Sequence, residues 1–445
     1  MTATIHPLHA NGEPSLDPLM QLVAEPMNGV NAVILERMQS KVALIPELAG
    51  HLIAGGGKRM RPMLTLACAE LLNYPGARHH KLAAAVEFIH TATLLHDDVV
   101  DGSGTRRGKR TANLIWGNAA SVLVGDFLFS RAFELMVEDG SLKVLKILSA
   151  ASSVIAEGEV EQLTAQRRIE TDEEQYLSII SAKTAALFAA ACRVSPVVAE
   201  AGEEAELALD AYGKHLGIAF QLTDDVIDYA SDAAVMGNGV GVDFRDGKMT
   251  LPLILAYARG SEADRRFWRA AVAGDRVSDA DLAQATELMR SSGALADTIE
   301  RARYYGRRAI DALAPFPSGT AKTALTEAVE FAIARAYCWE LDSVPGLCHS
   351  LTMTIARISE LDRRTTQSGR ANSGIWLLEF ERSEGQRADP LTGWAGSGDT
   401  NTQVKLIFRT RDEAIAYAER HKLAYHLVPA TPVKLKIQTY ADNFR

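Results

Sequence analysis

Two acidic clusters of the same spacing lie far apart in this chain, and each one closes an apolar run. The first is Asp97-Asp98-Val99-Val100-Asp101, and the second is Asp224-Asp225-Val226-Ile227-Asp228. On a helix the outer aspartates of a cluster share one face, where like charges repel each other. A divalent cation that prefers oxygen ligands converts this repulsion into binding. The pattern predicts two apolar helices whose acidic ends face each other and hold Mg²⁺ on a phosphate-bearing substrate.

The segment from residue 19 to 340 has a helical pattern. Apolar residues recur there at helical spacing between short breaks rich in Gly, Pro and Asn, and no alternating strand pattern stands out. Helices that are apolar around much of their circumference are buried, so we expect a large all-α bundle. Its central helices are predicted at residues 81–100, 112–137, 172–199 and 204–229. The polar residues 1–18 are predicted to be a disordered lead.

The pattern changes after residue 340. Residues 341–352 are typical of a linker, and residues 353–445 predict a small α+β domain. Its expected elements are three strands and one amphipathic helix, at residues 376–380, 404–408, 424–428 and 412–420 respectively. This part holds 14 basic and 11 acidic residues, a net charge of +3, whereas the rest of the chain carries −12. The asymmetry favours two separate units.

Composition excludes several classes of protein. The four cysteines are scattered without a C-x-x-C pair, so neither a disulfide framework nor a zinc site is indicated, and a cytoplasmic setting is expected. The first 36 residues lack Lys and Arg, which argues against a secretion signal or transit peptide. No uninterrupted apolar run reaches the roughly 20 residues that span a bilayer. Neither unit is basic enough to indicate nucleic-acid binding.

Cations accompany both acidic clusters. Upstream of the first lies Gly55-Gly56-Gly57-Lys58-Arg59-Met60-Arg61, which is not a phosphate-binding P-loop because Arg follows the Lys. It suits an anionic ligand, or it is a solvated turn that begins a helix. Arg106 and Arg107 follow the first cluster, either neutralising it or binding the same anion. Lys183 lies in an apolar helical stretch, where it reaches either the surface or a ligand, and Lys248 follows the second cluster.

The order of these motifs resembles a trans-polyprenyl diphosphate synthase over about residues 20–340. Leu94–Asp101 with Arg106-Arg107 is similar to the family's first aspartate-rich motif, Gln221–Asp228 to its second, and Gly56–Pro62 to its isopentenyl diphosphate loop. The resemblance implies an all-α isoprenoid synthase bundle, usually a homodimer. It implies a Mg²⁺-dependent enzyme that condenses isopentenyl diphosphate repeatedly onto an allylic diphosphate.

The resemblance also implies a role for each matching residue. The expected metal ligands are Asp97, Asp98, Asp101, Asp224 and Asp228, with Asp225 supporting them. The diphosphate of the allylic substrate is expected to bind Arg106, Lys183, Thr184, Gln221 and Lys248. Isopentenyl diphosphate is expected to bind Lys58, Arg61, His90 and Arg107.

Two features refine the expected activity. Ala92 and Thr93 lie one turn before Asp97, and small residues there resemble the long-chain synthases that make octaprenyl to decaprenyl tails for quinones such as ubiquinone. Small residues also serve simply to pack two helices. The chain departs from the family where Asn238 replaces a diphosphate-binding Lys and Val242 replaces an Asp. The lost contact costs about 1.5–3 kcal/mol, which would slow the reaction without abolishing it.

The C-terminal part resembles a different family. Trp376–Phe380, Asp389–Trp394 and the final Tyr440–Arg445 are similar to the complex I accessory subunit called iron-sulfur protein 4, although residues 353–445 contain no cysteine. We expect this part to contact respiratory complex I, at the inner face of the membrane. Two alternatives to a synthase stay open. One is a class I terpene cyclase, which would have no use for Lys58 and Arg61, and the other is a complex I assembly subunit with an inactive synthase domain.

Overall fold

The computed structural model describes two compact units, Met1–Pro345 and Gly346–Arg445. In the first unit the described residues are 14–53, 58–106, 109–230, 240–274 and 277–335. In the second they are 356–360, 376–380, 387–388, 395–396, 405–408, 410–411, 413–415 and 425–428.

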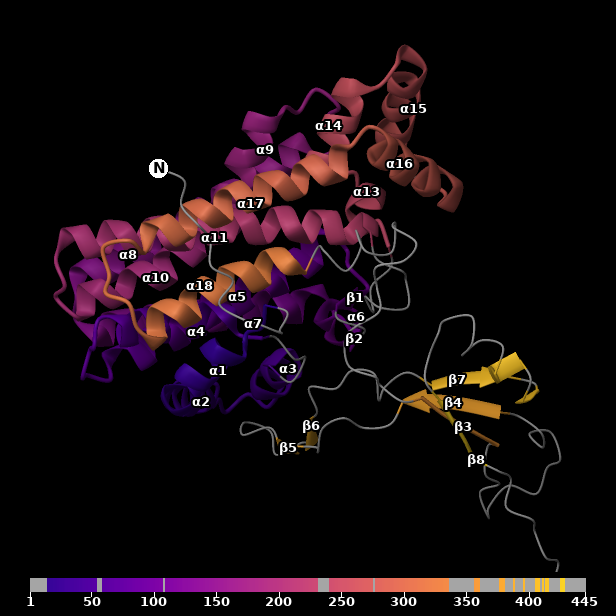
Figure 1. The fold of residues 1–445 in the computed structure, drawn as a ribbon. Coiled ribbons are helices and arrows are strands. Elements are labelled where there is room, and N and C mark those ends of the chain that lie inside the picture. The colour runs from indigo at the N-terminus through magenta and orange to yellow at the C-terminus, as the bar shows by residue number, and fades with distance from the viewer. Residues whose placement is uncertain are drawn as a thin grey trace, which may run out of the picture. The chain divides into compact units, whose positions relative to one another are not determined.

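The described part of the first unit is almost entirely helical (Figure 1). Its first half contains α1 (Asp17–Leu22), α2 (Ala24–Arg37), α3 (Leu44–Ile53), α4 (Met60–Leu71), α5 (Arg78–Val100), α6 (Ala112–Trp116), α7 (Asn118–Asp139) and α8 (Leu142–Ala165). Its second half contains α9 (Glu173–Ile180), the π-helix η1 (Ser181–Ala185), α10 (Ala186–Val198), α11 (Glu203–Ala230), α13 (Val242–Asp246), α14 (Leu251–Arg259), α15 (Glu262–Ala273), α16 (Asp279–Ser291), α17 (Ala294–Ala312) and α18 (Thr320–Ala334).

Local sequence sets where many helices begin and end. Asp172 caps α9 by accepting a hydrogen bond from the Gln175 backbone N–H, because the first N–H groups of a helix have no partner within it. Ser261 and Ser278 begin α15 and α16 with reciprocal capping boxes. Gly102 adopts a positive φ of 62° just after α5, a conformation that glycine accepts without strain. The first acidic cluster therefore lies at a fixed helix end.

The long helices pack around a buried interior. In Figure 1, α11 and α17 run side by side, and α10 contacts α4, α5, α8 and α11. Large side chains such as Phe88, Phe188, Tyr212 and Trp268 are fully buried. At about 25 cal/mol per Å² of apolar surface, such side chains are the main source of stability. The predicted all-α bundle is confirmed.

The second unit contains a four-stranded sheet in the order β7 (Lys405–Phe408), β4 (Trp376–Phe380), β3 (Ala356–Glu360) and β8 (Tyr425–Val428). Strands β3 and β8 are parallel, and the other pairs are antiparallel. A short ladder joins β5 (Arg387–Ala388) to β6 (Ala395–Gly396). Ile358 and Leu378 pair in the central strands and are fully buried. The predicted strands at 376–380, 404–408 and 424–428 are present with small shifts, and the predicted helix is described only at 411 and 413–415.

The structure differs from the sequence-based expectations at several points. No strand was predicted in the first unit, but β1 (Thr105–Arg106) and β2 (Lys109–Arg110) form a two-residue ladder. Strands this short cannot show an alternation of polar and apolar residues in the sequence. Gly117, with φ of 87°, divides the predicted helix 112–137 into α6 and α7. The disordered lead predicted for residues 1–18 is too long, because Leu16 is buried and α1 begins at Asp17. The predicted linker at 341–352 lies outside the described residues.

Within the part of the chain that the structure describes, one helical stretch is long and apolar enough, by length and composition alone, to cross a membrane. It is the continuous run Glu173–Val198, and 61% of its apolar window is buried inside the bundle. That burial is typical of a core helix.

Candidate active site

The first acidic cluster occupies the last turn of α5, and each of its aspartates meets a cation. Asp97 lies 3.7 Å from Lys183 Nζ. Asp98 is buried and accepts a hydrogen bond from Arg106 Nε at 2.9 Å. Asp101 accepts a hydrogen bond of 3.0 Å from Lys248 Nζ. The three carboxylates therefore draw their partners from η1, from β1 and from the loop after α13.

The second cluster lies near the end of α11 and is held mostly by uncharged donors. The buried Asp225 accepts hydrogen bonds from Tyr176 Oη at 2.5 Å and from Gln221 Nε2 at 2.8 Å. Asp228 accepts the backbone N–H groups of Val242 and Asp243 at the start of α13. Among the described residues, only Asp224 of this cluster forms an ion pair, with Arg335 at 2.7 Å. These hydrogen bonds fix the orientation of the second cluster.

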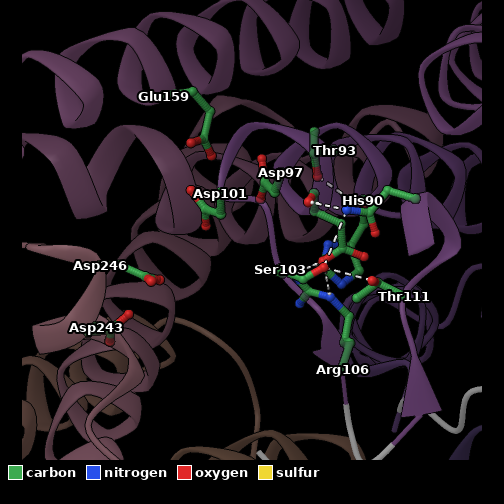
Figure 2. Close-up of polar contacts among 12 residues, drawn as sticks. His90, Thr93, Asp97, Asp101, Ser103, Arg106, Thr111, Glu159, Asp243 and Asp246 are labelled. Carbon is green, nitrogen blue, oxygen red and sulfur yellow. Dashed lines mark hydrogen bonds and ion pairs between the residues drawn. The ribbon is translucent and has the colours of Figure 1, made fainter. Parts of the chain in front are cut away.

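Several carboxylates converge around Lys183 and Lys248. Figure 2 shows Asp97 of α5 and Asp101, which directly follows that helix, pointing toward Glu159 of α8, while Asp243 and Asp246 of α13 lie nearby. Lys183 Nζ lies 2.7 Å from Glu159 Oε2. Lys248 Nζ lies 3.4 Å from carboxylate oxygens of both Asp243 and Asp246. Two lysines thus stand among more acids than they can neutralise.

Burial and crowding of acids shift the pKa values of these groups. Burial, and then repulsion from Asp243, raises the pKa of Asp228 to about 7. The same two causes raise the pKa of Asp225. Burial raises the pKa of Asp97, with a further contribution from Asp101. Burial disfavours the charged form of Lys248, but Asp243, Asp101 and Asp246 outweigh it and raise the pKa of this lysine.

A basic cavity of about 350 Å³ adjoins the first cluster. Its lining brings together the predicted residues Lys58, Arg61, His90 and Arg106 with Asp98. Arg61 Nη1 lies 3.2 Å from His90 Nε2, and its guanidinium lies over the Phe188 ring at 4.3 Å. Cations backed by aromatic faces and opening toward a carboxylate form a site for an anion with an apolar portion.

A second cavity of about 110 Å³ is lined by Asp225 of the second cluster and contains a chain of hydrogen bonds. Thr184 Oγ1 donates to Gln221 Oε1 at 2.8 Å. Gln221 then donates to Asp225, which also receives the Tyr176 hydroxyl. Lys183 and Lys248 line the same cavity. The predicted ligands of the allylic diphosphate therefore meet here, with the exception of Arg106, which lies in the basic cavity.

The donor set suits a hard cation. Within the described ranges, no group of three His, Cys, Asp or Glu side chains is arranged to hold a metal ion. The acidic side chains nevertheless offer only oxygen ligands, the ligand type of Mg²⁺. The buried Oδ2 of Asp98 has no hydrogen-bond partner. Burial raises the pKa of Asp97 and Asp228, and a nearby divalent cation would favour the ionised form of both carboxyls. The residues fit divalent cations that arrive with an anionic ligand.

Some predicted residues lie elsewhere, and some residues of the site escaped prediction. Arg107 and Asn238 lie outside the described residues. Glu159, Tyr176 and Arg335 belong to the site but were not predicted. Glu159 is one of three alternating glutamates in α8, and Tyr176 lies on the buried face of an otherwise acidic helix start. Asp243 was also missed. It lies shortly before the predicted Lys248, and the two acids close to that lysine in sequence could have identified it.

Comparison with known proteins places this site in a family. Residues 42–289 match the sequence model described as polyprenyl synthetase. The chain belongs to the polyprenyl synthetase family. It is 45% identical over 321 residues to the octaprenyl diphosphate synthase of Escherichia coli strain K12, covering 72% of this chain and 99% of that relative. It is 42% identical to a nonaprenyl diphosphate synthase of Rhodobacter capsulatus, covering 70% of this chain and 96% of that relative.

Solved structures of polyprenyl synthetases support the same family assignment. A polyprenyl synthase of Caulobacter crescentus, complexed with calcium and isoprenyl diphosphate, has a TM-score of 0.71 and 52% identity, covering 73% of this chain and 99% of that one. A decaprenyl diphosphate synthase of Rhodobacter capsulatus has a TM-score of 0.70 and 49% identity, covering 72% and 99%. The predicted isoprenoid synthase bundle and the assignment as a prenyltransferase are confirmed.

The second unit has its own match. Residues 355–445 match the sequence model described as NADH dehydrogenase ubiquinone Fe-S protein 4. The predicted resemblance of the C-terminal part to this family is therefore confirmed.

Proposed function

We propose that the first unit makes a long all-trans polyprenyl diphosphate by repeated condensation of isopentenyl diphosphate onto an allylic diphosphate. The observation that carries this proposal is the meeting of two acidic clusters with two separate sets of cations. The cavity with Lys183, Thr184 and Lys248 suits the diphosphate of the allylic substrate. The basic cavity with Lys58, Arg61 and His90 suits isopentenyl diphosphate.

In this proposal Asp97, Asp98 and Asp101 hold Mg²⁺ together with Asp224 and Asp228, while Asp225 orients the second cluster. Bound Mg²⁺ supplies stabilisation of the negative charge that develops on the leaving diphosphate. Lys183 and Lys248 add positive charge at the same place. The C–O bond of the allylic diphosphate breaks, and the electron pair leaves with the diphosphate.

The resulting allylic cation is attacked by the double bond of isopentenyl diphosphate, which Lys58 and Arg61 hold nearby. A new C–C bond forms, and loss of one proton restores a double bond. We assign that proton to the released diphosphate, a base that the reaction itself generates. Phe188 and Phe220 line the basic cavity and help to exclude water from the cation.

A product assay tests the proposal. Purified protein is incubated with Mg²⁺, farnesyl diphosphate and labelled isopentenyl diphosphate, and the dephosphorylated products are separated by length. We expect one long product that disappears in Asp97→Ala and persists in Asp126→Asn, an exposed aspartate on α7. Folded protein that elongates no allylic primer would contradict the proposal.

The long product is supported by the helix turn before the first cluster. Ala92 is buried, and Thr93 donates its hydroxyl to the His90 carbonyl at 2.8 Å, so neither side chain projects bulk into the site. The two relatives described above, at 45% and 42% identity, are an octaprenyl and a nonaprenyl diphosphate synthase. We expect Thr93→Phe to shorten the product while leaving the first condensation intact. An unchanged product length would show that growth is limited elsewhere.

We also propose a homodimer. Leu123 and Val137 on α7 and Val160 on α8 are exposed by 67%, 65% and 60%, although they are large and apolar. Scattered apolar residues need no partner, but several on adjacent helices indicate an interface. We expect the mass in solution to be that of two chains and to fall to one chain in Leu123→Lys/Val137→Lys. A wild-type monomer would contradict this.

For the second unit we propose peripheral contact with respiratory complex I on the cytoplasmic side of the membrane, supported by the match at 355–445. The polyprenyl product of the first unit would then become the side chain of ubiquinone. A complex I subunit with an inactive synthase is the alternative. Co-purification with complex I that is lost on deletion of residues 353–445 supports contact, and a negative product assay would favour the alternative.

A further inference from the structure

Lys183 and Thr184 lie in a π-helical turn inside an otherwise continuous helix. The turn spans Ser181–Ala185, between α9 and α10. A π turn holds one more residue than the α-helix around it and frequently occurs at functional sites. The flanking helices keep their buried faces, with Ile179 and Ile180 before the turn and Leu187 and Phe188 after it. The extra residue therefore changes the direction of the side chains within the turn.

Two glycines from different helices contact this turn at its backbone. A Cβ added at Gly158 of α8 would lie 2.9 Å from the Lys183 backbone N and 2.7 Å from Ala182 Cβ. A Cβ added at Gly217 of α11 would lie 2.6 Å from Ala185 Cα. Glycine costs about 1 kcal/mol relative to alanine inside a helix. Gly158 lies in the middle of α8, so close approach, not helix stability, accounts for a glycine there.

The residue after Gly158 contacts the other end of Lys183. Glu159 Oε2 lies 2.7 Å from Lys183 Nζ, closer than Asp97 at 3.7 Å. Adjacent residues of α8 thus meet both the backbone and the ammonium group of the same lysine. Lys183 has a long, flexible side chain, so its ammonium group is well placed only if both ends are constrained.

We propose that Gly158 is a positioning residue, which sets the π turn at the distance from α8 that aims Lys183 at the allylic diphosphate. Glu159 holds the ammonium group until the substrate diphosphate competes for it. Because Thr184 lies in the same turn and bonds Gln221, displacement of the turn would also disturb the second acidic cluster. This inference rests on the proposed prenyl transfer and adds the element that orients its lysine.

The test compares the wild type with Gly158→Ala and with Gly158→Ala/Ala182→Gly. The double variant removes the contact between the two Cβ atoms. It keeps the close contact between the new Cβ at position 158 and the Lys183 backbone N. Gly29→Ala in α2 is the matched control, because its Cβ meets the His80 ring instead. Readouts are kcat, KM for each substrate, melting temperature, and binding of inorganic diphosphate with Mg²⁺ by calorimetry.

We expect both Gly158 variants to lose between about tenfold and a hundredfold in kcat and in diphosphate affinity, the usual cost of misplacing a catalytic group. The KM for isopentenyl diphosphate should stay within about twofold, since that substrate binds elsewhere. Gly29→Ala should retain wild-type kinetics. Wild-type kcat and diphosphate affinity in either folded Gly158 variant would overturn the proposal. So would failure of both variants to fold, because Gly158 would then serve the bundle as a whole. Inactive wild-type protein that still binds inorganic diphosphate in a Gly158-dependent way would contradict only the proposed function.

Discussion

The two acidic clusters have the same spacing in sequence but different surroundings. The first meets three cations, Lys183, Arg106 and Lys248, from three separate elements. The second is oriented by Tyr176, Gln221 and the backbone of α13, with Arg335 as its one cation among the described contacts. An identical motif therefore serves two purposes. The first cluster is paired with cations that can exchange their partners. The second is oriented mainly by uncharged donors, and burial raises the pKa of its carboxyls, so a bound cation would favour their ionised form.

The largest effect is expected when an aspartate that holds Mg²⁺ is removed, because the reaction then loses most of its rate. Asp97→Ala and Asp228→Ala should each lower kcat by about a thousandfold or more, because the metal-held stabilisation of the leaving group is worth several kcal/mol. Product formation is measured under saturating Mg²⁺, with Asp126→Asn as the active control. If only one cluster were needed, one of the two variants would keep near-normal activity, and the comparison between the clusters would fail.

The cations of the two clusters should differ in their effect on stability. Arg106→Gln leaves the buried Asp98 without its charged partner and should lower the free energy of unfolding by about 2–3 kcal/mol. Arg335→Gln affects a pair whose side chains are 31% and 35% exposed, so it should cost below about 1 kcal/mol. Urea denaturation of metal-free protein measures both. Equal losses would show that burial does not separate the clusters.

The neutral donors of the second cluster should matter for rate. Tyr176→Phe removes the hydroxyl bonded to Asp225, a hydrogen bond to a charged group worth about 1.5–3 kcal/mol, so kcat should fall about tenfold to a hundredfold. Tyr229→Phe is the matched control, because its buried hydroxyl bonds Thr250 instead of an aspartate. Similar kinetics in the two variants would mean that Asp225 needs no fixed orientation.

The last prediction concerns stability without metal, and the expected change is confined to high pH. The folded pKa of Asp228 is about 7, above the value of about 3.9 for an unfolded aspartate. Folding therefore opposes ionisation of this group, at a cost that grows from about pH 4 to pH 7 and then stays constant. In EDTA, Asp228→Asn should raise the melting temperature by a few degrees near pH 8 and leave it almost unchanged near pH 4. A lower melting temperature near pH 8 would contradict the view of an uncompensated second cluster.

The sequence was sufficient for the parts of the fold and site that depend on local pattern. Apolar periodicity identified α5 and α11, and the acidic clusters were correctly expected at the ends of these two helices. The partners of those clusters depend on tertiary contacts. Glu159 and Tyr176 are ordinary residues until α8 packs against η1 and α9 packs against α11. The π turn at Ser181–Ala185 carries no local signal, because the close approach of Gly158 and Gly217 belongs to other helices. Strand β3 was missed because it buries Ile358 between polar neighbours.

The pairing of β3 with β8 has a consequence for biosynthesis. These strands are among the first and the last elements of the second unit, and they lie side by side in its sheet. During translation, β3 is synthesised near the start of the unit, and its parallel neighbour β8 follows only when almost the whole unit has been translated. The helical bundle is complete well before that point and can fold as it emerges. Translation that stops early would therefore release a finished enzyme with an unfolded tail.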